Sequence, residues 1–245
     1  MSRLAARSTH NARLSEWFVP RRGPLWFRTA IGLLFLPYTG MVLSYTVIGG
    51  MLATSVVWHR VGALLVIYFF GLGIAAHALD ALGSRGIKPW GEVFSRRQLW
   101  FAAGGSLIAA YAIAGHYSFW YVPWLAAVAV VEGFFVFAYN LEWWNGRFHT
   151  DGWFALSWGA LPVLAGYAMQ TNGVSVAALI VAAAMAALSV VEITASRAYK
   201  DLKRKSTRSA DETASATMYE RILKSVSLGV IALGIGVALF RFTHG

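Results

Sequence analysis

A histidine and an aspartate lie three residues apart in the sequence AHALDALGS, where a long apolar run ends. Residues three apart are neighbours on one face of a helix, so His77 and Asp80 point the same way. An ionisable group in such an apolar run costs free energy unless it has a partner or a ligand. The pair therefore indicates a site that holds a metal ion or a polar substrate group at a membrane surface.

Two other apolar runs end in similar residues. One closes with Asn140 and Glu142, and His149 follows in the next connection. The other holds Glu192, followed by Arg197. If all three runs cross a bilayer in the same direction, these residues lie at one membrane depth. Glu132 lies about 15 Å further along its helix than Glu142, where it can bond a neighbouring helix as a carboxylic acid.

The composition predicts an all-α, polytopic membrane helical bundle. Hydrophobic residues make up 58% of the chain and charged residues 13%, whereas soluble domains hold about 25% charged residues. The mean hydropathy is +0.55. Cysteine is absent, which excludes disulfides, Fe–S clusters and thiolate metal sites. Because a bilayer-crossing helix needs about 20 apolar residues, we expect seven transmembrane segments. They lie at about 26–51, 61–83, 99–115, 119–142, 153–170, 174–196 and 222–240.

The basic segment 1–25 precedes a single transmembrane domain at 26–245. It is either a disordered tail or an interfacial amphipathic helix, and in that helix a few apolar side chains would face lipid. These are Leu4, Leu14, Trp17 and Phe18. The connection before the last segment, at about 198–221, is expected to be a polar loop that is helical at most near its end.

The distribution of basic residues predicts the orientation. All but two of the 21 lysines and arginines fall on one side of this topology, and the exceptions are Arg60 and Arg241. By the positive-inside rule, the N-terminus is cytoplasmic and the C-terminus outside an inner (plasma) membrane. The net charge of +10 is therefore mostly a topology signal, and we expect no nucleic-acid partner.

The layout over about residues 23–200 resembles the UbiA-type intramembrane prenyltransferases. That family has an NDxxDxxxD motif at the cytoplasmic end of its second helix, where this chain reads AHALDALGS, and a basic loop follows. FAYNLEWWNGRFHTDGWFALSWGALPVLAGY is similar to the end of the family's fourth helix and its fifth helix. EITASRAYKD stands in the place of the second DxxxD motif. Of the motif acids this chain keeps Asp80 and, as an acid, Glu192, while His77 replaces an aspartate.

The resemblance implies Mg²⁺-dependent transfer of a prenyl group from a prenyl diphosphate, with His77, Asp80 and Glu192 as the catalytic positions. It also implies a set of residues that bind the substrate. These are Arg85, Lys88, Tyr139, Asn140, Arg147, Arg197 and Lys200. Aromatic faces can stabilise the allylic cation that forms when the diphosphate leaves. The available aromatic residues, which also suit an interfacial belt, are Phe134, Phe137, Trp143, Trp144 and Trp153.

Two alternatives remain open. Imidazole suits Fe or Zn better than Mg²⁺, so the histidines also favour a mixed-ligand metalloenzyme that oxidises or hydrolyses a lipid. Its ligands would be His77, Asp80, Glu142, His149 and Glu192. The second alternative is a non-catalytic, lipid-binding or assembly subunit, with which the loss of several motif carboxylates is compatible.

Overall fold

The computed structural model describes residues 14–83, 93–205 and 207–244, and the regular structure within these ranges is entirely helical. Within these described residues, five helices are long and apolar enough to cross a membrane. They are Leu25–Met51, Trp58–Gly83, Arg96–Trp120, Val176–Arg204 and Ala210–His244. The predicted helical membrane bundle is thus confirmed at this level. The predicted segments at 119–142 and 153–170 also form helices, but neither is among the five.

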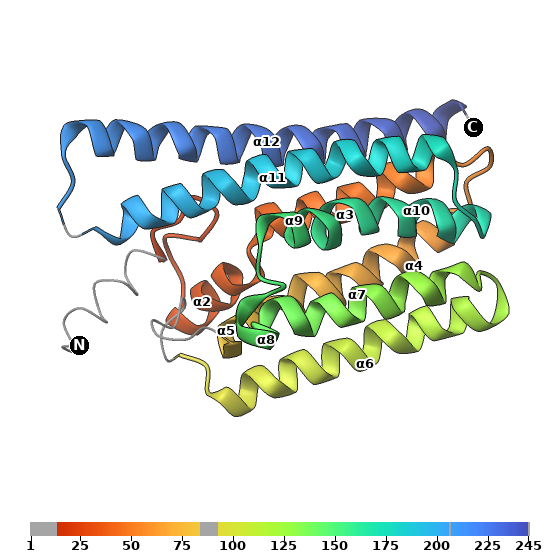
Figure 1. Ribbon diagram of the computed structural model, residues 1–245, viewed down its shortest axis with the longest axis horizontal. Coiled ribbons are helices and arrows are strands. Elements are labelled where there is room, and N and C mark those ends of the chain that lie inside the picture. The colour runs from red at the N-terminus through yellow and green to blue at the C-terminus, as the bar shows by residue number, and fades with distance from the viewer. Residues whose placement is uncertain (1–13, 84–92, 206, 245) are drawn as a thin grey trace.

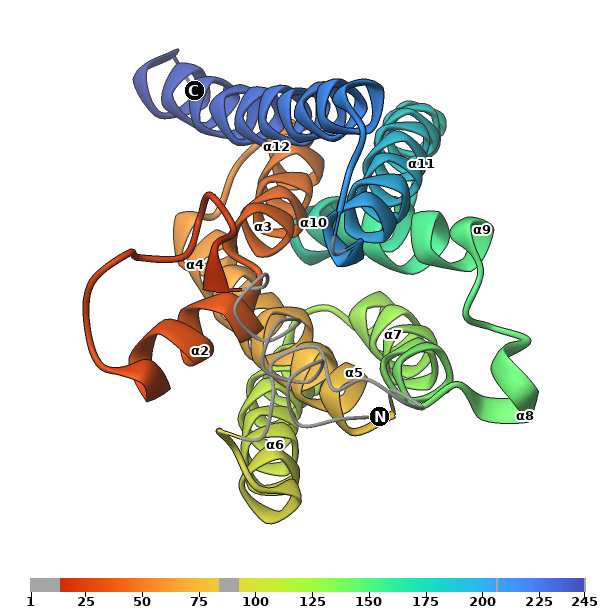
Figure 2. The ribbon, with the colours of Figure 1, turned by 90° about the vertical axis from the view of Figure 1, so that its left-hand side faces the viewer.

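The first predicted segment is broken in two. Helix α2 (Leu25–Leu34) and helix α3 (Leu36–Met51) meet at Phe35, whose φ of 46° is left-handed. Pro37 lies in the first turn of α3, where its missing N–H costs no hydrogen bond. The chain therefore changes direction at Phe35, and Figure 2 shows α2 diverging from the axis of α3.

Two helical rods contain a π-helical stretch. In the first, α4 (Trp58–Tyr68) continues through η1 (Phe69–Ala76) into α5 (His77–Gly83). In the second, α9 (Asp151–Phe154) continues through η2 (Ala155–Ala160) into α10 (Leu161–Thr171). π-Helical turns occur often at functional sites, and η1 ends directly before His77.

Helices α6 (Arg96–Trp120) and α7 (Trp124–Asn140) lie between these rods in the sequence. A capping box of Ser95 and Gln98 begins α6. The short helix α8 (Trp143–Gly146) follows Glu142, which has a φ of 52°, and contains the left-handed Asn145.

The last two helices are longer than predicted. Helix α11 (Val176–Arg204) and helix α12 (Ala210–His244) extend through most of residues 198–221, so the expectation of a long polar loop was wrong. Ion pairs stabilise these extensions. Lys224 Nζ lies 2.6 Å from Glu220 Oε1 on the next turn, and Lys205 pairs with Glu212 across the turn that joins the helices.

The helices form two groups. Figure 1 and Figure 2 show α3, α10, α11 and α12 together on one side of the bundle, with α4, α5, α6 and α7 on the other. Helices α3 and α10 are packed almost backbone to backbone. A Cβ on Gly49 would lie 2.0 Å from the Val163 carbonyl oxygen, and one on Gly166 would lie 2.1 Å from that of Thr46. Small residues permit this close approach, as they do in many membrane proteins.

The described part of the chain before α2 contacts the rest of the protein. Leu14 and Val19 are buried, and the Phe18 ring centroid lies 5.0 Å from that of Phe35. The Tyr199 hydroxyl lies 3.0 Å from Glu16 Oε2, and the side chain of Lys224 covers the Trp17 ring. Leu14, one of the residues expected to face lipid if this segment is an interfacial helix, is therefore buried in protein, and Trp17 and Phe18 are half-buried. Leu4 lies outside the described residues.

Candidate functional site

Helices α5 and α7 meet at one end of the bundle, the left-hand end of Figure 1. A Cβ on Gly83 would lie 2.1 Å from the Asn140 carbonyl oxygen, so only glycine permits this approach of the two helix ends. The approach brings Asp80, one turn before Gly83, within electrostatic range of the Tyr139 hydroxyl. Residues from the second and fourth predicted segments thus come together.

Tyr139 is at the centre of the candidate site. Its ring is buried and stacks on His149 with a centroid distance of 4.3 Å, and His149 Nδ1 lies 3.0 Å from the Tyr139 carbonyl oxygen. The guanidinium of Arg197 faces the Tyr139 hydroxyl. Arg197 also pairs with Asp151, which connects α11 to the first residue of α9.

One helical turn beyond Arg197, Lys200 joins a second set of predicted residues. It interacts electrostatically with both His77 and Glu192, and its Nζ lies 5.0 Å from the centroid of the Phe35 ring. Phe35 is also next to His77, with ring centroids 6.0 Å apart. The break between α2 and α3 therefore places an aromatic ring between the lysine and the histidine.

Glu192 is 1% exposed, and its Oε2 has no hydrogen-bond partner. The buried hydroxyl of Tyr38 lies next to the Ser196 side chain and within electrostatic range of this carboxylate. Leaving the Glu192 oxygen unpaired in the interior costs free energy, so it marks a place where a ligand can supply the missing contact.

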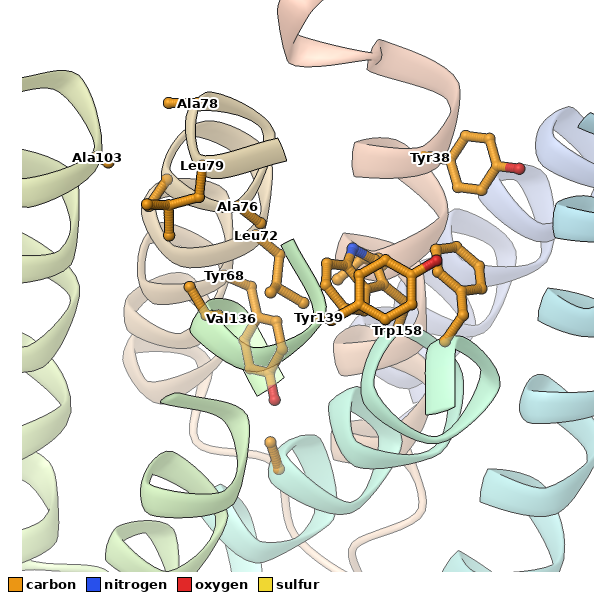
Figure 3. Packing of buried hydrophobic residues seen from close by; sticks show 14 of the residues in the cluster. Tyr38, Tyr68, Leu72, Ala76, Ala78, Leu79, Ala103, Val136, Tyr139 and Trp158 are labelled. Atoms are coloured by element: carbon orange, nitrogen blue, oxygen red, sulfur yellow. The ribbon is translucent and has the colours of Figure 1, made fainter. Parts of the chain in front are cut away.

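An aromatic wall lies beside these polar groups. Tyr139 has ring-centroid distances of 4.9 Å to Trp158 and 5.8 Å to Phe154, and Tyr38 lies 5.8 Å from Phe154. Figure 3 shows Tyr38, Tyr139 and Trp158 close together in the core. Of these rings, sequence reasoning selected only Tyr139. Tyr38 carried no signal beyond its position within the first apolar run.

The aromatic residues expected to line the site lie elsewhere. Trp143, Trp144 and Trp153 are at least 37% exposed, and Phe134 is 36% exposed. They form an outer cluster around Phe148, and Phe137 joins its edge by stacking on Trp143. Their role as an interfacial belt, which was the alternative interpretation, agrees with this exposure.

Other predicted residues have surroundings different from those of the cluster of His77, Asp80, Tyr139, Glu192, Arg197 and Lys200. The Asn140 amide donates to the Val136 carbonyl at 2.8 Å within its own helix. Arg147 is exposed at the end of α8, and Glu142 occupies the left-handed position before it. Arg85 and Lys88 lie outside the described residues.

The described parts of the chain hold no group of three or more His, Cys, Asp or Glu side chains that are close enough to bind one metal ion. The five predicted Fe or Zn ligands are therefore not seen at a single point. Carboxylates of the kind that Mg²⁺ prefers are present singly, at Asp80 and Glu192.

Comparison with known proteins gives no relative: no family model, no curated protein and no solved structure matches this chain.

Proposed function

We propose that this chain is an integral-membrane enzyme that acts on an isoprenoid or other lipid with an anionic head group, at the cytoplasmic end of its helices. By resemblance, the reaction is the transfer of a prenyl group from its diphosphate. The observation that supports this best is the meeting of Arg197, Lys200 and Glu192 with the aromatic wall of Tyr38, Tyr139, Phe154 and Trp158.

The two cations are suited to an anionic head group. Arg197 presents a planar fork that matches phosphate oxygens, and Lys200 adds a mobile point charge one helical turn away. Both are partly exposed, so a head group that arrives from the aqueous side can reach them. Their role is to hold the diphosphate in place and to neutralise the charge that develops as it leaves.

The aromatic wall is suited to the apolar chain of such a substrate. Tyr139, Phe154 and Trp158 pack closely on one another. An apolar chain that contacts this group would be shielded from water. When the bond to the diphosphate breaks, the allylic cation left on the substrate is attracted to the faces of these rings. The Tyr139 hydroxyl, next to Arg197 and Asp80, is at the boundary between the polar and apolar parts of the site.

The residues present also fit Mg²⁺. This ion usually binds one or two carboxylates together with substrate phosphates and water, and it needs no cluster of protein ligands. Asp80 and Glu192 are the residues that would hold it, and the unpartnered Glu192 Oε2 is an oxygen available for the purpose. When bound, the ion would supply further neutralisation of the diphosphate.

The proposed topology has seven spans with the site on the cytoplasmic side. The 17 residues of α7 extend about 25 Å, and residues 151–171 extend about 30 Å, close to the thickness of a bilayer core. The two basic residues on the proposed outer side have local partners. Arg60 donates to the Met169 carbonyl near the end of α10, and Arg241 donates to the Ala53 and Thr54 carbonyls after α3.

The second candidate function is the mixed His/carboxylate metalloenzyme with Fe or Zn. The observation in its favour is that His77 and His149 both lie next to members of the cluster, namely Lys200 and Tyr139. The Fe or Zn enzyme needs three or more protein ligands at one point, whereas the Mg²⁺-dependent transferase does not. The non-catalytic subunit ranks third.

Binding of farnesyl diphosphate to the purified protein, with and without Mg²⁺, tests the proposal. We expect Mg²⁺-dependent binding that Arg197→Gln weakens by about 10- to 100-fold, since charge-assisted hydrogen bonds contribute about 1.5–3 kcal/mol. Arg204→Gln is the matched control, because Arg204 lies on the same helix but pairs with Asp201. Wild-type protein that binds no prenyl diphosphate would contradict the transferase function, and stoichiometric Fe or Zn in that protein would favour the second candidate.

A further inference from the structure

A small cavity lies between α4, η1, α6 and α7, away from the cluster described above. Its volume is about 60 Å³, and apolar side chains make up most of its lining. The polar exceptions are Tyr68, Tyr111 and Glu132. Glu132 is about 12 Å from either end of α7, so the cavity lies deep in the part of the bundle that a membrane would surround.

Only one of the two carboxyl oxygens of Glu132 has a hydrogen-bond partner. The Tyr68 hydroxyl donates to Oε1 at 2.9 Å, whereas Oε2 is buried without a hydrogen-bond partner. Tyr111 does not supply the missing bond, because its hydroxyl donates to the Ala129 carbonyl at 2.9 Å. Glu132 is 9% exposed, so an aqueous phase does not satisfy this oxygen. The cavity thus presents one hydrogen-bonding atom in apolar surroundings.

Among the residues that line the cavity, Tyr111 is the most exposed, at 42%, and its hydroxyl lies over Gly133. A Cβ on Gly133 would lie 1.9 Å from the Tyr111 hydroxyl, so the glycine is what allows the ring to cover α7 at this point. Because Tyr111 is the exposed part of the lining, a molecule dissolved in the membrane would approach the cavity past its ring, between α6 and α7.

We propose that this cavity binds the head of a long-chain membrane alcohol, with its hydroxyl group on Glu132 Oε2. A hydroxyl both donates and accepts, so it complements this oxygen whether the carboxyl is ionised or neutral. It brings no charge into the membrane, where a charge is costly. The cavity has room for the hydroxyl end and a few methylene groups, and the rest of the chain lies among the lipid tails.

This site is separate from the proposed catalytic site and does not depend on it. Figure 3 shows the Tyr139 hydroxyl pointing away from Tyr68, the partner of Glu132. The two sites would bind different lipids. The proposed catalytic site binds an anionic head group at the membrane surface, and the cavity binds an uncharged alcohol within the bilayer.

Photolabelling tests the proposal. The full chain in phosphatidylcholine nanodiscs is irradiated with a hexadecanol that carries a diazirine near its hydroxyl end, and the labelled peptides are mapped by mass spectrometry. We expect saturable labelling of α4, α6 or α7 around the cavity, which unlabelled hexadecanol displaces and hexadecane does not. Equal displacement by both competitors would show ordinary contact with lipid and overturn the proposal.

Four variants add controls at the level of single residues. Glu132→Leu should reduce saturable labelling about fivefold, as expected for the loss of one hydrogen bond, whereas Glu132→Gln should retain it because the amide still donates and accepts. Gly71→Leu fills the cavity from η1, where an added Cβ has no atom within 4 Å, and should abolish labelling without touching Glu132. Gly62→Leu, equally unobstructed on α4 but outside the cavity, is its matched control. If Gly71→Leu labels as strongly as Gly62→Leu, the cavity is not the binding site, and this comparison stands even if Glu132→Leu fails to fold.

Discussion

Arg197 Nη1 lies 2.7 Å from Asp151 Oδ1, and this contact joins the end of α11 to the start of α9. The same guanidinium faces the Tyr139 hydroxyl, so one side chain connects three of the elements that form the candidate site. Arg197 therefore has two separable roles, as a link between helices and as a cation for a head group.

Exchanging the two charges separates these roles. The double variant Asp151→Arg/Arg197→Asp should unfold within a few degrees of the wild type, because the link is re-formed and a partly exposed pair contributes only about 0–1 kcal/mol. Farnesyl diphosphate binding should nevertheless fall at least about tenfold, because a carboxylate now stands where the cation stood. Thermal unfolding and equilibrium binding measure the two effects, and wild-type binding by the double variant would show that Arg197 is only structural.

The contact of Gly83 with the Asn140 carbonyl gives a second prediction. Gly83→Ala should destabilise the protein by about 1–3 kcal/mol, the usual cost of overpacking, and should weaken substrate binding because Asp80 moves away from Tyr139. Gly62→Ala is the control. It adds a methyl group with no atom within 4 Å and should be neutral or stabilising by up to about 1 kcal/mol. Equal thermal unfolding of the two variants would mean that α5 and α7 do not approach this closely.

A change at His77 distinguishes the two metal chemistries. For the transferase, His77→Asp restores a hard ligand about 4.5 Å along the axis from Asp80, so Mg²⁺-dependent diphosphate binding should be kept or improved. For the Fe or Zn enzyme, the same change removes an imidazole and should release metal. We expect the first result, measured by elemental analysis and by farnesyl diphosphate binding. Asp80→Ala should damage both kinds of site and serves as the control.

The orientation can be tested with single cysteines, since the chain has none of its own. Cysteines at Ser95, Asn145 and Ser209, all exposed at the proposed cytoplasmic end, should resist an impermeant thiol reagent applied to intact cells. A cysteine at Ser55, exposed after α3 at the other end, should react. The reverse pattern would place the site on the outer side and remove the basis for a cytoplasmic substrate.

The helical content and the approximate segments could be predicted because apolar run length is a strong signal in membrane proteins. The ends of α11 and α12 were missed because their polar extensions are stabilised by ion pairs such as Lys224–Glu220, which composition alone does not distinguish from a loop. Pro37, in the first turn of α3, is a signal for a helix start just after Phe35, but it was not used to divide the first segment. The stretches η1 and η2 have no comparable signal in the sequence.

The candidate site could be predicted in part. Asp80, Tyr139, Arg197 and Lys200 were selected for their residue type and depth, and the structure places each of them near other selected residues. Side-chain direction was not predictable. Asn140 lies at the expected depth, but its amide donates to its own helix. The tryptophans that were expected to line the site are exposed, and the rings that do line it include Tyr38 and Trp158.

The glycine contacts between α3 and α10 imply an order of events during synthesis. Gly49 leaves the ribosome long before Gly166, and at about 5–20 residues per second the delay is on the order of ten seconds. Through that interval the small-residue face of α3 has no final partner in the bilayer. We therefore expect chains truncated before α10 to be recognised as orphan membrane segments and degraded, and chains truncated after α10 to survive longer. Pulse–chase measurement of a truncation series would reveal a step in half-life at that helix.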